Sequence, residues 1–123
     1  VGIQLALPDR PVVAVIGDGS SMYNIQALWT AANLELPITY VIANNRGYRI
    51  LKERLIAFHD NHNFIGMDFH SPELDFVSLA ESMGVKSRRI ECAKDFSSAL
   101  KESISSNGPT LLDVMVDDGF GNR

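Results

Sequence analysis

Two short polar turns in the sequence carry side chains that can bind cations and phosphate groups. The first is Gly17-Asp18-Gly19 and the second is Asn44-Asn45, and each directly follows a run of apolar residues. Asp18 supplies a carboxylate and Asn45 a neutral amide oxygen, which are hard ligands suited to Mg²⁺ or Ca²⁺. One carboxylate alone holds Mg²⁺ poorly, so we expect the remaining ligands to be phosphate oxygens and water.

The residues around the first turn favour phosphate binding. Gly17 and Gly19 let the backbone approach a ligand closely. Ser20 and Ser21 add amide and hydroxyl donors at the start of a helix, where anions bind well. An asparagine at position 45, rather than a second aspartate, is consistent with this site, because another negative charge would repel a phosphate that shares the ion. The two turns together predict a site for a divalent cation and a phosphorylated ligand.

The elements that must position these turns alternate between strands and helices. The expected order is strand, helix, strand, helix, helix, strand, helix and strand, over residues 12–16, 24–34, 38–43, 48–58, 75–83, 85–91, 95–106 and 110–116. This alternation predicts an α/β fold, a parallel sheet with helices on both faces, in which ligands bind beyond the carboxyl ends of the strands. A strand–helix–strand unit returns the chain to the same edge of the sheet, so we expect both turns to face one ligand.

Several residues predict how these elements begin, end and pack. The 12–16 strand lacks polar alternation, so both of its faces are expected to be covered. The charged 85–91 strand is expected to lie near an edge of the sheet. Asp75 is predicted to cap one helix that Gly84 ends, and Asp95 is predicted to cap the next.

Residues 48–58 are predicted to form an amphipathic helix. Its apolar side includes Ile50, Leu51 and Phe58, with the charged residues opposite. The following segment, 59–74, shows no periodicity, and loops of that length are often functional.

Composition restricts the classes of function. The chain has 123 residues, 46% of them hydrophobic, and a formal net charge of −4, which fits one globular domain. Its basic residues are scattered, which argues against nucleic acid, and every apolar run is interrupted, which argues against a membrane span. A single cysteine favours a reducing, cytoplasmic compartment. VGIQLALPDRP opens without Met and is typical of a helix that began earlier, so we expect residues 1–123 to be a piece of a longer protein.

The sequence resembles the diphosphate-binding signature of thiamine diphosphate enzymes. That signature pairs Gly-Asp-Gly with Asn-Asn, and here 24 residues separate Gly19 from Asn44. The segment Leu28-Trp29-Thr30-Ala31-Ala32, together with Pro37 and Tyr48, is most similar to benzoylformate decarboxylase and its near relatives. The resemblance covers nearly the whole chain. It identifies residues 1–123 as a C-terminal domain that binds thiamine diphosphate and Mg²⁺, with Ca²⁺ as the alternative ion.

The resemblance also implies roles for individual residues. The metal ligands would be Asp18, the side chain of Asn45 and the backbone carbonyl of Gly47. Ile50 and Leu51 fall where relatives line the substrate pocket, and helix core is the alternative for both. No residue of this chain inherits a catalytic role. The full set implied to bind the cofactor is Gly17, Asp18, Gly19, Ser20, Ser21, Asn45, Gly47 and Tyr48.

The implied reaction belongs to a larger protein. The full-length chain would be a lyase that decarboxylates a small 2-oxo acid, with the thiazolium ring of the cofactor accepting the electrons released with CO₂. The resemblance further implies an amino-terminal pyrimidine-binding domain, a middle domain, and a homodimer or homotetramer in which a partner subunit supplies the activating glutamate. Residues 1–123 are therefore expected to be inactive alone.

Other hypotheses fit parts of the same pattern. An acetolactate synthase-like carboligase would share the cofactor signature, and a non-catalytic cofactor-binding domain would retain the turns without the reaction. A dinucleotide-binding domain is disfavoured, because Met22 stands where the third glycine of its motif belongs. Arg46 and Arg49 depart from the most similar relatives, and they either favour an acidic substrate or lie in solvent.

Overall fold

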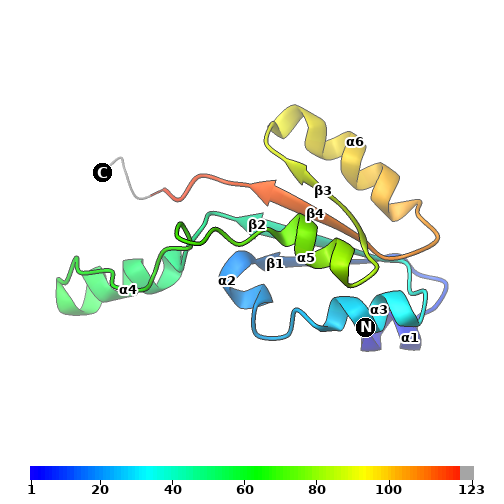
Figure 1. Cartoon of the computed structure of the whole chain (residues 1–123), viewed down its shortest axis with the longest axis horizontal. Coiled ribbons are helices and arrows are strands. Elements are labelled where there is room, and N and C mark those ends of the chain that lie inside the picture. Colours follow the sequence, from blue (N-terminus) through cyan, green and yellow to red (C-terminus); the bar gives the residue numbers. More distant parts are fainter. Residues whose placement is uncertain (120–123) are drawn as a thin grey trace.

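A four-stranded parallel sheet forms the centre of the computed structural model, which describes residues 1–119 (Figure 1). The order across the sheet is β1-β2-β4-β3, and every neighbouring pair is parallel. The predicted α/β fold is therefore confirmed, and the charged strand β3 lies at an edge as expected. Residues 120–123 of the predicted domain lie outside the described residues. The strands are β1 (Val12–Gly17), β2 (Ile38–Asn44), β3 (Lys86–Ile90) and β4 (Thr110–Met115).

Helices cover both faces of this sheet (Figure 1). In the described part of the chain they are α1 (Gly2–Ala6), α2 (Asp18–Ser21), α3 (Ala27–Asn33), α4 (Arg49–His59), α5 (Phe76–Ser82) and α6 (Ala93–Ile104). Helices α3 and α5 pack on one face, and α6 packs on the other. Parallel connections are right-handed, so the reversal of direction between β3 and β4 moves α6 to the opposite face. Among residues 1–119, every helix is too short or too polar to cross a bilayer.

The core consists of one apolar cluster on each face. On the first face, Leu28 of α3 and Phe76 of α5 pack against β2 and β4. On the second face, Ala99 of α6 packs against Val41 and Leu112. The central strands β2 and β4 are therefore covered on both sides, which explains their nearly continuous apolar sequences.

Strand β1 differs from the prediction that both of its faces are covered. Its burial alternates, and Val13 and Val15 are 40% and 71% exposed. The cause is the sheet order, because β1 is an edge strand and the described residues of the α6 cluster include none from β1. The alternate residues, such as Ala14 and Ile16, pack against the α3 and α5 side.

The ends of α5 match the sequence prediction, whereas the start of α6 does not. Asp75 accepts hydrogen bonds from the backbone amides of Val77 and Ser78, and Gly84 follows the helix with φ of 80°. The prediction that Asp95 caps α6 is wrong. Cys92 occupies the N-cap, and Asp95 lies in the first turn of the helix.

Replacing Asp75 by alanine is expected to lower the free energy of unfolding by about 1 kcal/mol at neutral pH, the usual worth of an N-cap. The hydrogen bonds from the Ser78 hydroxyl and amide lower the pKa of the Asp75 carboxyl below its ordinary value. The ionised cap therefore stabilises the fold above the unfolded-state pKa, and this contribution disappears as pH falls through the lower folded-state pKa. Urea unfolding of both proteins at neutral and acid pH would measure the difference. If the difference in unfolding free energy between the two proteins grows at acid pH, Asp75 is not an ionised N-cap.

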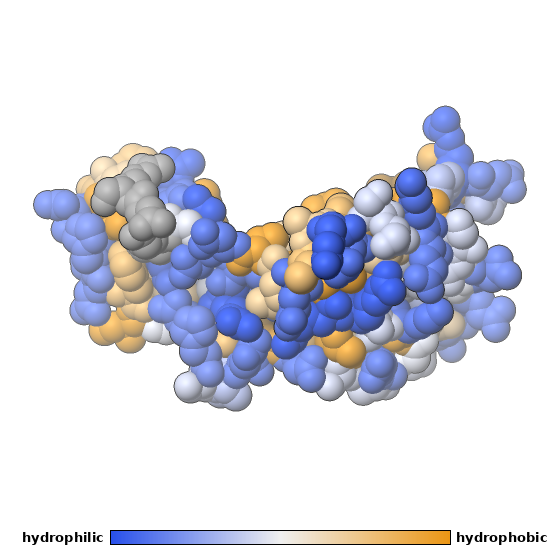
Figure 2. Space-filling model, turned by 90° about the horizontal axis from the view of Figure 1, so that it is seen from above, coloured by the Kyte–Doolittle hydropathy of each residue, from blue (hydrophilic) through white to orange (hydrophobic). Residues whose placement is uncertain are grey.

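Helix α4 projects beyond the carboxyl ends of the strands, away from the faces of the sheet (Figure 1). Its apolar residues Ile50, Leu51 and Phe58 are 59%, 48% and 70% exposed, so the helix-core alternative for Ile50 and Leu51 is wrong. Figure 2 shows hydrophobic surface at this end of the molecule. Lys52 is the buried residue of this helix, and it forms an ion pair with Asp68 in the loop that follows.

Candidate functional site

An open cavity of about 390 Å³ lies beyond the carboxyl ends of β1, β2 and β4. In Figure 2 the molecule is notched between its α4 end and the body of the sheet. Every predicted site residue except Ser21 and Leu51 lines this cavity. The lining consists of Gly17, Asp18, Gly19, Ser20, Ala43, Asn45, Gly47, Tyr48, Arg49, Ile50, Glu53, Val116 and Asp117.

Asp18 joins the two polar turns. It follows β1 directly and is only 3% exposed. Its Oδ1 accepts a hydrogen bond from the amide of Gly19 at 2.8 Å, and its Oδ2 accepts one from the amide of Gly47 at 3.0 Å. Burial raises the pKa of the Asp18 carboxyl above its ordinary value, and these amide donors only partly offset that effect. A cation bound here would compensate the buried charge.

The amide of Asn45 meets Asp18 at the same point. One terminal atom of this amide lies 3.2 Å from both carboxylate oxygens of Asp18 and 2.8 Å from the carbonyl oxygen of Gly47. If that atom is the nitrogen, it donates to these oxygens. If it is the oxygen, three acceptors face one another, which is favourable when a cation lies between them. Carboxylate, amide and carbonyl together are a donor set that fits Mg²⁺ or Ca²⁺ and leaves positions for phosphate and water.

Tyr48 packs directly on the first turn. A Cβ atom added to Gly19 would lie 2.6 Å from Cδ1 of the Tyr48 ring, so only glycine allows this approach. The neighbouring Phe69 ring packs against Tyr48 in a T-shaped arrangement at a centroid distance of 4.7 Å. The two turns are thus in contact through a side chain as well as through Asp18.

Comparisons with known proteins show which family the chain belongs to. Residues 1–114 match the family described as thiamine pyrophosphate enzyme, C-terminal TPP binding domain. The chain belongs to this family. TPP is another name for thiamine diphosphate, so the family resemblance seen in the sequence is confirmed.

Relatives of this TPP-binding domain include enzymes of two kinds. A putative acetolactate synthase large subunit of Mycobacterium tuberculosis is 41% identical, over 98% of this chain and 24% of that protein. Benzoylformate decarboxylase of Pseudomonas aeruginosa is 35% identical, over 93% of this chain and 21% of that protein. A solved thiamine diphosphate-dependent 4-hydroxybenzoylformate decarboxylase of Rhodococcus jostii aligns with a TM-score of 0.88 and 40% identity, over 95% of this chain and 22% of that chain. The domain therefore spans about a fifth to a quarter of these relatives.

The aperiodic loop of the TPP-binding domain holds its second turn. The amide of Tyr48 donates to the carbonyl of Met67 at 2.9 Å, and the amide of Phe69 donates to the carbonyl of Arg46 at 2.8 Å. A Cβ atom at Gly47 would lie 2.7 Å from the Met67 carbonyl oxygen. Glycine at 47 therefore serves close backbone packing, and the loop between α4 and α5 supports the cavity wall.

The two predicted serines have different surroundings. Ser20 is exposed and lines the cavity. Ser21 is 2% exposed, and its hydroxyl donates to the carbonyl of Asp18 at 2.6 Å. The Ser21 hydroxyl therefore stabilises the single turn of α2, and this arrangement gives no support to its predicted contact with the diphosphate.

Some cavity residues were not anticipated from the sequence. Val116 and Asp117 follow β4, and the strand-end rule that selected the other two turns would have selected them too. Arg49 forms an ion pair with Glu53 at 2.9 Å, and Arg46 forms one with Glu73 at 3.1 Å. Because both guanidinium groups have carboxylate partners, the structure gives no support to a special preference for an acidic substrate.

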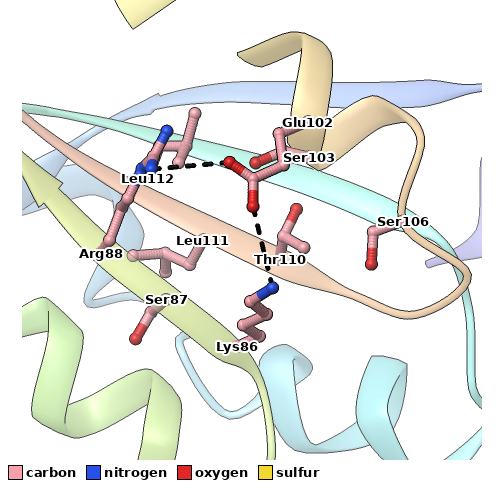
Figure 3. Close-up of a pocket in the computed structure, with 9 residues that line it drawn as sticks. All are labelled: Lys86, Ser87, Arg88, Glu102, Ser103, Ser106, Thr110, Leu111 and Leu112. Atoms are coloured by element: carbon pink, nitrogen blue, oxygen red, sulfur yellow. Dashed lines mark ion pairs between the residues drawn. The ribbon is translucent and has the colours of Figure 1, made fainter. Parts of the chain in front are cut away.

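A second hollow lies between β3, β4 and α6 (Figure 3). Its volume is about 50 Å³, well below the roughly 300 Å³ of small-molecule sites. Glu102 lies 3.9 Å from Lys86 and 3.5 Å from Arg88 across its opening. The cavity at the strand ends is therefore the candidate functional site.

Replacing Gly19 by alanine is expected to lower the free energy of unfolding by about 1–3 kcal/mol, because the new methyl group must displace the Tyr48 ring. Gly17→Ala is the matched control. Nothing lies within 4 Å of a Cβ atom at Gly17, so we expect a change within about 0.5 kcal/mol. Urea unfolding would compare the two variants, and equal effects would contradict the proposed close contact.

Proposed function

We propose that the chain is the TPP- and Mg²⁺-binding domain of a 2-oxo acid decarboxylase resembling benzoylformate decarboxylase. The proposal depends on one observation, which is the convergence of the Asp18 carboxylate, the Asn45 amide and the Gly47 carbonyl beside the cavity. The similarity to a solved 4-hydroxybenzoylformate decarboxylase supports the decarboxylase class.

The chain would bind and orient the cofactor. Asp18, the Asn45 side chain and the Gly47 carbonyl would hold Mg²⁺. Among the remaining cavity residues, Gly17, Gly19, Ser20 and Tyr48 would contact the diphosphate. TPP, when bound, supplies a thiazolium ring that accepts the electrons released with CO₂.

Ile50 is proposed as a substrate-pocket residue, because it lines the cavity and is 59% exposed. Leu51 is also exposed but does not belong to the cavity lining, so it carries no such proposal. The exposed apolar side of α4 supports contact with a further domain or subunit. We propose amino-terminal pyrimidine-binding and middle domains in a cytoplasmic homodimer or homotetramer, acting on a small 2-oxo acid.

An acetolactate synthase-like carboligase is the second candidate. It is favoured by the 41% identity to a putative acetolactate synthase large subunit. The cavity residues bind the cofactor in either case, so they do not separate the two reactions.

Three measurements test these proposals. Calorimetric titration with TPP, with and without Mg²⁺, is expected to show binding that requires the metal, and binding that is unchanged by a chelator would contradict the metal site.

Product analysis of the full-length protein is expected to show aldehyde and CO₂ from an aryl 2-oxo acid. Acetolactate from pyruvate would favour the carboligase instead, and turnover by residues 1–123 alone would contradict the expected inactivity.

A further inference from the structure

Asn44 precedes the proposed metal ligand Asn45 in the sequence, yet it does not belong to the cavity lining. It is 2% exposed, and both ends of its amide are used. Its Nδ2 donates to Oδ1 of Asp113 at 2.9 Å, and its Oδ1 accepts from the backbone amide of Arg46 at 3.1 Å. A role for Asn44 must therefore act through its neighbours.

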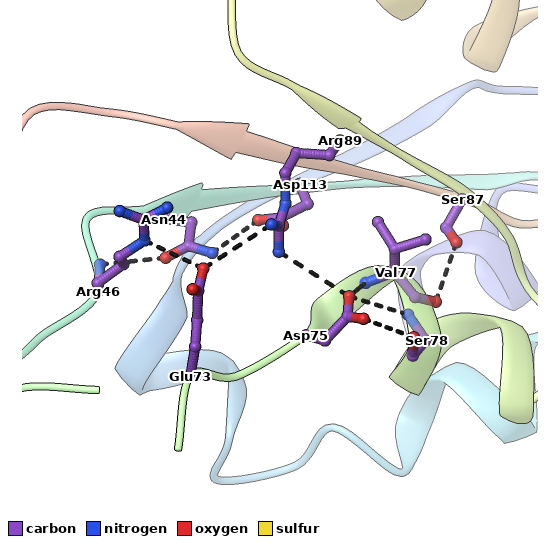
Figure 4. A network of polar contacts seen from close by, with 9 residues as sticks. All are labelled: Asn44, Arg46, Glu73, Asp75, Val77, Ser78, Ser87, Arg89 and Asp113. Carbon is purple, nitrogen blue, oxygen red and sulfur yellow. Dashed lines mark hydrogen bonds and ion pairs between the residues drawn. The ribbon is translucent and has the colours of Figure 1, made fainter. Parts of the chain in front are cut away.

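Asp113 determines which way the Asn44 amide points. It is fully buried within β4, and its Oδ2 accepts from Nε of Arg89 at 2.9 Å. Arg89 is its direct neighbour on β3, and Asn44 reaches it from β2 (Figure 4). An ionised carboxylate only accepts hydrogen bonds, so it requires the NH₂ end of Asn44. The carbonyl end of Asn44 must then face the amide of Arg46.

The side-chain carbonyl of Asn44 stabilises an uncommon backbone conformation at Arg46. Arg46 has φ of 59°, a left-handed conformation that residues with a Cβ atom adopt rarely. The hydrogen bond from the Arg46 amide to the Asn44 side chain closes an Asx turn over residues 44–46, and this turn ends at Arg46. The ion pair between Arg46 and Glu73 holds the same turn from its outer side.

That conformation aims the backbone of Gly47 at the site. The Gly47 amide then donates to Oδ2 of Asp18 at 3.0 Å, and its carbonyl oxygen lies 2.8 Å from the Asn45 amide. Two of the three proposed metal ligands belong to this turn. Their placement follows from a hydrogen-bonded chain that begins at Arg89, on the far edge of the sheet.

We propose that Asn44, Asp113 and Arg89 are positioning residues for the metal site, acting by fixing the Asn45–Gly47 turn. This inference rests on the proposed function, because it presupposes that the turn binds Mg²⁺ with TPP. Partners of this kind, one step behind the ligands, commonly contribute about 10- to 100-fold to metal affinity.

The test is a polarity swap. Asn44→Asp places a carboxylate against Asp113 and is expected to raise the Mg²⁺ concentration for half-maximal TPP binding by about 10- to 100-fold. Adding Asp113→Asn restores a donor facing position 44, while its carbonyl can still accept from Arg89. The double variant is therefore expected to recover most of the Mg²⁺ affinity. Intrinsic fluorescence at fixed TPP would follow binding, and hydrogen exchange of the Gly47 amide would follow the turn without metal.

A matched control separates positioning from general stability. Ala99→Gly loosens the core on the opposite face, so it should lower the melting temperature without changing the Mg²⁺ midpoint. An unchanged midpoint in a folded Asn44→Asp protein would overturn the proposal. If Asn44→Asp does not fold, Asn44→Ser replaces it in the test, because serine cannot reach Asp113. Wild-type Mg²⁺ affinity in Asn44→Ser would also overturn the proposal. Metal-independent TPP binding by the unchanged protein would overturn the proposed function itself.

Discussion

Asp18→Ala is expected to abolish Mg²⁺-dependent TPP binding. The substitution removes the one carboxylate at the point where Asn45 and Gly47 converge, and it removes the acceptor that ties the second turn to the first. Its effect should exceed the roughly 10- to 100-fold that is typical of groups one step behind a metal. Titration of Mg²⁺ at fixed TPP would measure the loss.

The Asp18→Ala protein is expected to stay folded. Burial raises the pKa of Asp18, so its charge opposes folding as pH rises from the unfolded-state pKa to the folded-state pKa. Removing that charge therefore offsets the loss of the two hydrogen bonds. Asp95→Ala, which removes an exposed carboxylate in α6, is the matched control. Normal TPP affinity in a folded Asp18→Ala protein would refute the metal assignment.

Arg89→Met is expected to have the largest effect on stability, about 3–5 kcal/mol at neutral pH. The substitution leaves the carboxylate of Asp113 buried without its charged partner, although Asn44 still donates to it. Urea unfolding would measure the deficit.

A second substitution tests the origin of that deficit. Combining Arg89→Met with Asp113→Asn removes both charges and keeps an acceptor for Asn44, so much of the lost stability should return. If the two substitutions instead destabilise the protein additively, the loss does not arise from an unpaired charge.

Local sequence patterns predicted which segments form helices and strands better than they predicted what covers each of these elements. The run from Val12 was correctly predicted as a strand, but its position at an edge depends on the order of strands, which periodicity does not encode. The exposure of the apolar side of α4 was not predictable for a separate reason. An amphipathic pattern shows that a helix has an apolar side, and it does not show what covers that side.

The site was predictable to the extent that it follows from strand ends. Asp18 and Asn45 could be placed in one cavity because parallel strands end at the same edge. The strain in the second turn was not predictable, since a glycine at 47 suggests a positive φ there, and the structure places it at Arg46 instead. Asp113 left a usable signal, because a lone charged residue inside the apolar run TLLDVMV requires a buried partner.

The ends of three strands line one cavity, so a ligand that binds there also stabilises the folded state. A ligand that contacts both Asp18 and Gly47 links the end of β1 to the end of β2, and it is released when the protein unfolds. At a free concentration about 100 times its Kd it would add about 2.7 kcal/mol to the folded state. A thermal-shift panel of phosphorylated compounds and divalent ions would therefore rank candidate ligands before any assay of turnover.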